Sequence, residues 1–393
     1  MPIPIERMSR PVERISVCNL LSFGESAEPL DLRPLNVLIG INGSGKSNLI
    51  ETLGLLASMP RGVSGYIGQS GGILHWLWKG SDAVPIAKID VSGELPDERQ
   101  FSHQIAFTRV EQSIEVVDES VSVWLRGKRH PGKPVFGYEK GVPVSRPRGR
   151  ARSLERKDID FTQSILWQEQ SADVTYPLDP LTRLYRSFRI YRINNIEPSK
   201  HPQQPDLPGD YLIPDAKNLS VVLSRLMLRK AFRKLLMDRL IKFYPEFEDL
   251  TVHTEAGTQQ IYVQESDLHS PVPTSRLSDG TLRWLCLLAI LLHPEPPPLV
   301  CIEEPEIGLH PDIVVELAEL LREASTRMQL IVTTHSRTLV DGLTGTPEDV
   351  IVYEKDEGST RLHRLDADDL RVWLERYSLG QLWSRGQLGG NRW

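Results

Sequence analysis

The sequence predicts an α/β fold with a parallel sheet, an antiparallel β subdomain and a helical lobe. Helix patterns alternate with short apolar strands between Arg276 and Tyr353, which is typical of a parallel sheet. An apolar strand at 35–40 leads through a glycine-rich loop into a helical pattern at 47–59. Alternating β-branched runs between 84 and 138 indicate antiparallel strands joined by polar turns.

The remaining elements follow from periodicity and turn residues. The first strands are expected within 13–23. Loops rich in proline and glycine are expected at 141–158 and 197–216. One further set of elements completes the expected order: a basic helix at 220–243, strands at 249–256 and 259–266, a helix at 280–292, a strand at 298–302, a helix at 311–324 and a strand at 329–333.

Composition narrows the function classes. The 393 residues carry a net charge of −6, so any nucleic-acid contact must come from a local basic patch. The three cysteines lie far apart among apolar neighbours, and we expect them reduced in the core. The apolar run at 285–292 is too short to cross a membrane, and the amino-terminus lacks a signal-peptide pattern. We therefore expect a soluble, cytoplasmic protein without membrane contact.

A phosphate-binding loop is predicted between the strand at 35–40 and the following helix. The residues fit the pattern G-x-x-x-x-G-K-[ST]: Gly40-Ile41-Asn42-Gly43-Ser44-Gly45-Lys46-Ser47. Glycines let backbone N–H groups turn towards phosphate oxygens, and the helix adds the positive end of its dipole. Lys46 would bind the β- and γ-phosphates, and Ser47 would ligate Mg²⁺. We expect ATP as the nucleotide, with Asn42, Gly43, Ser44, Gly45 and Asn48 also in the binding loop.

Two carboxylates follow the apolar strand at 298–302. Ligands of open α/β sheets collect at the carboxyl ends of strands. Next to a phosphate loop, Glu303 would hold Mg²⁺ and Glu304 would act as general base towards water, since phosphoryl transfer needs both. The alternative interpretation is a pair of solvated glutamates after a core strand.

Three further motifs resemble ABC-type ATPases of the RecF, SMC and overcoming-lysogenization-like group. Leu277-Ser278-Asp279-Gly280 resembles the signature LSGG, although Ser278 also fits a simple helix N-cap. The run 304–311 (EPEIGLHP) resembles their glutamate and D-loop segment, and 331–336 (IVTTHS) resembles their switch strand. The resemblance covers about half of the chain and includes stand-alone bacterial ATPases associated with defence. It implies that Ser278, Asp279 and Gly280 touch the γ-phosphate bound to an opposite subunit, and that His335 hydrogen-bonds the γ-phosphate.

The Q-loop glutamine of this group, a metal ligand, is harder to place. Gln163 precedes an apolar pair and is our choice, with Gln168 and Gln170 as rivals. The interval from Ser47 to Ser278 contains no sustained heptad pattern, so we expect a head without coiled-coil arms.

Two basic segments are candidates for contact with DNA or RNA phosphates. Four arginines crowd the loop after residue 141: Arg146, Arg148, Arg150 and Arg152. Three basic residues, Arg229, Lys230 and Arg233, lie in the basic helix. The alternative for this helix is a solvated charged face, with Leu226, Leu228, Leu235 and Leu236 turned inward.

We expect a single head, with a nucleotide-binding lobe at 12–83 and 246–355. An insertion at 84–245 would hold the β subdomain, basic loop and helical lobe, and 356–393 would form a carboxy-terminal extension. From the resemblance we expect a dimer, or a higher homo-oligomer, that closes on ATP and gates a separately encoded effector in bacterial anti-phage defence. The alternatives are a DNA repair or chromosome-maintenance ATPase, and an ATP-dependent assembly scaffold with slow turnover.

Overall fold

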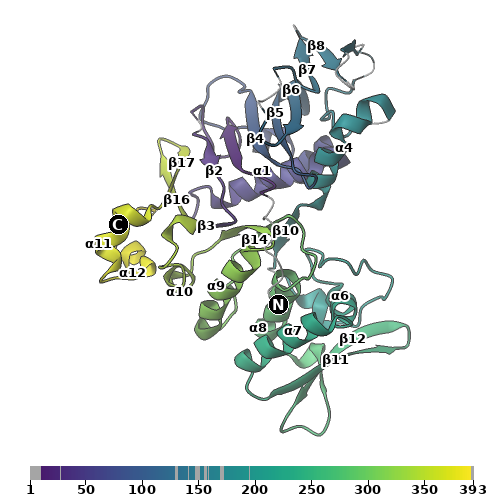
Figure 1. The fold of residues 1–393 in the computed structure, drawn as a ribbon, viewed down its shortest axis with the longest axis vertical. Helices are drawn as coiled ribbons and strands as arrows, with labels where there is room; N and C mark the ends of the chain where they lie inside the picture. Colours follow the sequence, from purple (N-terminus) through teal and green to yellow (C-terminus); the bar gives the residue numbers. More distant parts are fainter. Residues whose placement is uncertain are drawn as a thin grey trace.

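The computed structural model describes residues 10–26, 28–128, 132–139, 141–146, 151–154, 157, 159–168, 172–193 and 195–390, with backbone alone at 172–177. These residues form three sheets and the helices around them (Figure 1). None of the helices in these ranges combines the length and apolarity needed to span a bilayer.

A six-stranded sheet carries the predicted phosphate loop. Its strands in spatial order are β10 (Arg189–Arg192), β14 (Leu299–Glu303), β15 (Gln329–Thr333), β3 (Leu35–Gly40), β16 (Val350–Asp356) and β17 (Ser359–Arg364). The first five run parallel, and β17 returns antiparallel from β16. The predicted parallel sheet is therefore confirmed.

The strands of this sheet are apolar throughout because both faces are covered. Along β3, Val37 and Ile39 belong to one core, whereas Leu38 belongs to another. The first core includes α8 (Asp279–Leu291) and α9 (Pro311–Ser325), and the second includes α1 (Lys46–Ser58). The period-2 alternation of the strand thus assigns each side chain to one of two cores.

The predicted antiparallel β subdomain is an eight-stranded sheet. Its order is β2 (Leu30–Asp31), β1 (Arg14–Cys18), β4 (Ala87–Glu94), β5 (Arg99–Val110), β6 (Ser113–Leu125), β7 (Phe136–Glu139), β8 (Val142–Ser145) and β9 (Arg152–Ser153). Figure 1 shows this sheet above α1. The amino-terminal strands β1 and β2 pair within this sheet and not within the parallel one, so the expected lobe boundary at 83 does not separate the two sheets.

Further helices connect the sheets. α1 packs against η1 (Met59–Arg61), α2 (Val63–Gln69) and α4 (Ala172–Ser187), and α3 (Ile73–Trp76) packs against α2. The others are α5 (Glu197–Lys200), η4 (Thr274–Arg276), α10 (Arg337–Asp341), η5 (Pro347–Asp349), α11 (Ala367–Leu374) and α12 (Leu379–Ser384). α12 packs on α10 through Leu379 and Leu382, so the carboxy-terminal extension is part of the first core.

The basic segment at 220–243 forms two helices, so the prediction of a single helix is wrong. α6 (Leu219–Leu226) ends before α7 (Lys230–Phe243), because Arg229 adopts an extended backbone with φ −87° and ψ 109°. Leu226 and Leu236 are buried as expected, but Leu228 is 83% exposed and Leu235 is 48% exposed. Because the helix breaks at Arg229, α7 buries a different face from the one that a single continuous helix would bury.

A small third sheet accompanies α6 and α7 in the lower lobe of Figure 1. It consists of β11 (Phe247–Glu255), β12 (Thr258–Glu265) and β13 (Val272–Pro273), and the first two confirm the strands predicted there. This sheet lies in the helical lobe, although 246–276 was expected in the nucleotide-binding lobe. Conversely β10, from the expected insertion, is the outer strand of the parallel sheet.

Candidate nucleotide-binding site

The phosphate loop joins the end of β3 to the start of α1, as predicted. Three glycines, Gly40, Gly43 and Gly45, have φ values of 148°, 80° and 100°. A Cβ at Gly45 would collide with Thr360 Oγ1 and Ser22 Oγ, whereas a Cβ at Gly43 would meet nothing within 4 Å. Gly45 is therefore required both by its backbone conformation and by the close approach of its neighbours.

A chain of hydroxyl and amide groups supports the loop from behind. Asn48 Nδ2 donates to Ser22 Oγ at 2.6 Å, and Ser22 Oγ lies 2.6 Å from Thr360 Oγ1. Thr360 Oγ1 donates to the carbonyl oxygen of Ser44 at 2.8 Å. We call Ser22, Asn48 and Thr360 the rear brace. Asn48, expected to bind nucleotide, is thus occupied in holding the loop.

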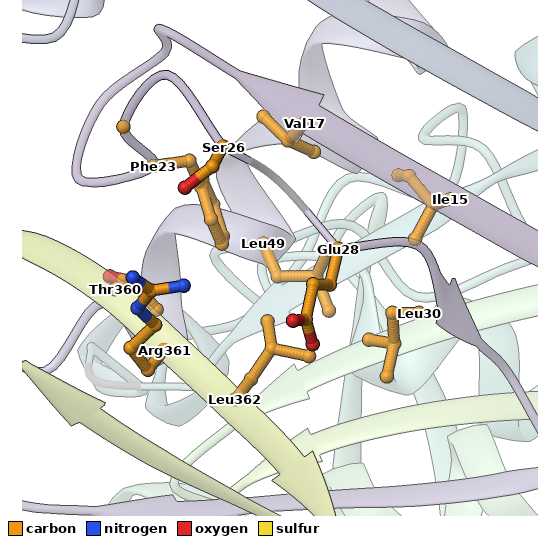
Figure 2. A pocket seen from close by; sticks show the side chains of 11 residues that line it. Ile15, Val17, Phe23, Ser26, Glu28, Leu30, Leu49, Thr360, Arg361 and Leu362 are labelled. Carbon is orange, nitrogen blue, oxygen red and sulfur yellow. The ribbon is translucent and has the colours of Figure 1, made fainter.

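A cavity lined by both apolar and charged residues, among them Glu28 and Arg361, lies beside the rear brace (Figure 2). Ile15 and Val17 of β1, Phe23, Leu49 of α1 and Leu362 of β17 point towards it. Its volume of about 40 Å³ is enough for ordered water. The cavity lies between β1, α1 and β17, beside the residues that support the phosphate loop.

Lys46 lies buried under the loop. Its Nζ donates to the carbonyl oxygens of Gly40 at 2.8 Å and Ile41 at 3.0 Å. Burial lowers the pKa of Lys46 to about 8, against the opposing effects of Glu304 and Glu306. The buried hydroxyl of Ser44 has no hydrogen-bond partner within the described residues. A cation and an unsatisfied hydroxyl below a cradle of N–H groups fit a phosphate group.

Glu304 and His335 come together from neighbouring strands. Glu304 has φ 46°, which is strained for a residue with a side chain, and its N–H donates to Thr333 O at 3.0 Å. This turn directs the carboxylate away from the line of β14, and His335 Nε2 lies 3.6 Å from Glu304 Oε1. Burial, and then the charge of Lys46, lower the pKa of His335, so its imidazole is neutral at pH 7. The predicted base, histidine and loop lysine are thus within electrostatic reach of each other.

Glu306 clamps the turn that carries His335, which the sequence motif did not reveal. Its Oε1 accepts hydrogen bonds from Thr334 Oγ1 at 2.6 Å, His335 N at 2.8 Å and Ser336 N at 3.2 Å. Burial raises the pKa of Glu306. The segment after the acidic pair therefore fixes the backbone of the switch segment.

Glu303 is held by a residue that the sequence analysis missed. Arg192, the last residue of β10, donates from Nε to Glu303 Oε1 at 2.7 Å and from Nη2 to Glu51 Oε1. Glu51 lies one helical turn after Ser47 on α1, so this pairing borders the expected metal position. Only the parallel pairing of β10 with β14 brings Arg192 and Glu303 together.

The donors present fit Mg²⁺ in a nucleotide complex. Magnesium is bound in such sites by one or two carboxylates together with substrate phosphates and water. Ser47 is exposed at the start of α1, and Glu303 lies at the end of β14. The described residues contain no cluster of three or more His, Cys, Asp or Glu that could hold a metal without phosphate.

The predicted signature opens α8. Ser278 is the N-cap, and its Oγ accepts from Thr281 N at 3.1 Å. Asp279 pairs with Lys200 at 2.8 Å, which lowers the pKa of the carboxyl. A Cβ at Gly280 would come within 2.8 Å of the carbonyl oxygen of Gly308. The signature therefore packs directly on the segment that follows the acidic pair.

The structure does not bring Gln163 to the phosphate loop, so its prediction as a metal ligand is corrected. Its Nε2 donates to Ser64 Oγ, in α2 beyond the carboxyl end of α1. The thirteen residues of α1 span about 20 Å, and Ser47 lies at the opposite end. Gln168 donates to backbone carbonyls of the same turn, and Gln170 lies outside the described residues.

Most described candidates for nucleic-acid contact are engaged within the protein. Arg146 is buried and bonds Glu139 and the carbonyl of Pro134. Arg229 pairs with Glu295, and Arg233 pairs with Asp249 of β11, each at 3.0 Å. Lys230 and Arg152 are exposed, and Arg148 and Arg150 lie outside the described residues. The two helices therefore present a charge-balanced face more than a basic patch.

One family model matches most of this chain. The family model "AAA domain, putative AbiEii toxin, Type IV TA system" matches residues 35–341, which include the phosphate loop, the acidic pair and His335. Among curated proteins, none matches the sequence.

Several solved SMC heads share the fold. The SMC head bound to the C-winged helix domain of ScpA has 16% identity and a TM-score of 0.60, covering 92% of this chain and 99% of that one. A Pyrococcus furiosus SMC head with an extended coiled coil, bound to the C-terminal domain of ScpA, has 14% identity and a TM-score of 0.55, covering 93% and 98%. A Pyrococcus yayanosii SMC head with a coiled coil and joint has 12% identity and a TM-score of 0.50, covering 93% and 99%.

The described residues of the present chain contain no coiled-coil arms. The family model matches most of the chain, which therefore belongs to the family of AAA domains described as putative AbiEii toxins, and its fold is that of an SMC head.

Proposed function

We propose that this chain binds and hydrolyses ATP with Mg²⁺, closes as a head-to-tail dimer around two ATP molecules, and gates a separately encoded effector in bacterial anti-phage defence. The observation that carries the enzymatic part is the convergence of Lys46, Glu304 and His335 at one edge of the parallel sheet. Such a site combines phosphate binding with a positioned base, as hydrolysis requires.

Each side chain has a role that follows from its surroundings. Lys46 exchanges its bonds to loop carbonyls for phosphate oxygens. Glu304 orients water and accepts its proton, while neutral His335 donates a hydrogen bond to the γ-phosphate. Magnesium, when bound by Ser47 and Glu303, neutralises charge on the β- and γ-phosphates.

The dimer places the signature of one chain on the nucleotide of the other. Ser278 caps the start of α8, whose free N–H groups suit an anion. Lys200 offsets the charge of Asp279, which would otherwise repel a phosphate. Gly280 packs on Gly308, so a shift near Glu304 would be felt at the signature.

The role in defence is supported by the AbiEii family description, which associates these domains with toxin–antitoxin systems. SMC heads bound to a domain of ScpA show that a head of this fold accepts a protein partner. A DNA repair or chromosome-maintenance ATPase is the second candidate, favoured by the SMC-like fold. The ion pairs of Arg229 and Arg233 weigh against DNA binding at α6 and α7.

The test is the solution mass of the Glu304→Gln protein, with and without Mg-ATP. This variant should bind ATP without hydrolysing it, and ATP should double its mass. Adding Ser278→Arg should prevent the doubling while each chain still binds ATP, because the larger cation blocks only the contact across the dimer. A mass that ignores ATP in both proteins would contradict the sandwich, and retained hydrolysis in Glu304→Gln would contradict the assignment of the base.

A further inference from the structure

A groove runs along the outer edge of the parallel sheet, away from the phosphate loop. Its volume is about 610 Å³. One wall is formed by the end of α1, η1 and α2, and the floor by Phe188 and β10, with Leu212 and Pro214 opposite. Gly65 leaves this wall open, since a Cβ there would meet nothing within 4 Å.

The floor of the groove is an unpaired strand edge. β10 pairs with β14 on one side, and it is the terminal strand of its sheet in the described residues (Figure 1). A strand at a sheet edge presents N–H and C=O groups that another extended chain can pair with. Ile190, which is partly exposed, adds apolar surface on the same strand.

The groove is strongly basic. Arg61, Arg189 and Arg192 line it, and among the described residues no Asp or Glu does. Arg61 donates to the carbonyls of Ala57 and Arg186, and Arg189 to those of Arg186 and Phe188. Within the part of the chain that the structure describes, neither of these two guanidinium groups has a carboxylate partner. Burial, and then the charges of Arg189 and Arg186, lower the pKa of Arg61, as expected for uncompensated like charges.

We propose that this groove binds an extended acidic segment of a partner protein, which adds as a strand to the outer edge of β10. The free edge favours a peptide, since main-chain pairing needs an extended polypeptide. The arginines favour acidic side chains, and Ile190 favours an apolar side chain between them. Nucleic acid would use the arginines but neither the strand edge nor the apolar floor.

The groove is connected to the ATP site by a single residue. Arg192 ends β10 in the groove, and its guanidinium bonds Glu303 and Glu51 beside Ser47. A strand paired with β10 would shift this guanidinium and so change the availability of Glu303. This link rests on the proposed ATPase function, whereas the docking of the peptide does not.

The first experiment measures binding of a fluorescent peptide of alternating glutamate and valine to the full chain by anisotropy. The wild type should bind it with a dissociation constant on the order of micromolar, weaker at high salt. The double variant Arg61→Glu/Arg189→Glu should bind at least about tenfold more weakly, a loss of about 1.4 kcal/mol. The matched variant Arg371→Glu/Arg376→Glu reverses two exposed arginines of the carboxy-terminal segment and should bind like the wild type.

The second measurement is hydrogen exchange with and without the peptide, which should slow the amides of residues 189–192. Failure of the wild type to bind, equal binding by the Arg61/Arg189 variant, or unprotected β10 amides would each overturn the proposal. So would a single-stranded oligothymidylate that binds with this arginine dependence when the peptide does not, since it would assign the groove to nucleic acid. Binding of a fluorescent ATP analogue to every variant, measured in parallel, distinguishes failure of the groove from failure of the ATP site.

Discussion

Replacing Glu306 by alanine tests whether this carboxylate holds the switch segment in place. Its Oε1 accepts three hydrogen bonds from the segment that carries His335: from Thr334 Oγ1, His335 N and Ser336 N. Alanine leaves the Thr334 hydroxyl and the His335 N–H without this acceptor, whereas Ser336 N keeps a second acceptor, Thr334 Oγ1, at 2.9 Å. The conservative variant Glu306→Gln keeps an acceptor oxygen at the same place.

The magnitude follows from the number and kind of bonds lost. A hydrogen bond to a charged group contributes about 1.5–3 kcal/mol net. The cost of burying the carboxylate, which also raises the pKa of Glu306, offsets part of the total stabilisation from these hydrogen bonds. We therefore expect Glu306→Ala to lower the free energy of unfolding by about 3 kcal/mol, and Glu306→Gln by about 1 kcal/mol.

The catalytic effect should exceed the effect on nucleotide binding. A displacement of about 1 Å at His335 costs roughly 100-fold in rate, because the hydrogen bond to the transition state depends on position. Urea denaturation gives the stability, and steady-state ATP hydrolysis gives kcat and KM. If Glu306→Ala keeps wild-type kcat, or if Glu306→Gln is as damaged as Glu306→Ala, then Glu306 does not position the switch segment through these bonds.

Three further predictions concern the loop and the metal ligand. Nucleotide affinity should be constant below about pH 7 and about tenfold weaker at pH 9, because only protonated Lys46 binds phosphate and its pKa is about 8 in the free protein. Fluorescence titration of a nucleotide at each pH measures this affinity. An affinity that does not change with pH would show that Lys46 does not titrate in this range. Gly45→Ala should abolish nucleotide binding, because the added Cβ collides with Thr360 and Ser22 of the rear brace. Gly43→Ala should cost only about 1 kcal/mol of backbone strain. If the two variants have equal effects on nucleotide binding and thermal unfolding, then the rear brace does not support the loop. Arg192→Ala should tighten Mg²⁺ binding in the presence of ADP by several-fold, because Glu303 and Glu51 lose their cation. Calorimetry measures the Mg²⁺ affinity, and Arg189→Ala is the control on the same strand. An unchanged or weaker affinity would count against competition between Arg192 and the metal.

The elements that the sequence predicted well are those encoded within a short window. The strand, loop and helix around Lys46 follow from periodicity and three glycines, and the structure confirms them. The strand that ends in Glu303 is likewise confirmed, because a continuous apolar run fits a strand covered on both faces. In contrast, the break at Arg229 was missed, since the charged and apolar pattern continues through it and only packing in the lower lobe sets the direction of α7.

The tertiary structure decided which distant residues complete the site. Thr360 and Ser22 are separated by 338 positions and Arg192 and Glu303 by 111, and no local pattern marks them as partners. Gln163 was predicted as a metal ligand from its residue type and neighbours along the chain, but the fold places it near the carboxyl end of α1, away from the phosphate loop. The sequence by itself predicted the phosphate loop and the acidic strand end, because these depend on neighbours along the chain. Their support by Glu306, Arg192 and the rear brace was decided only by the order and register of the strands, which bring remote segments into contact.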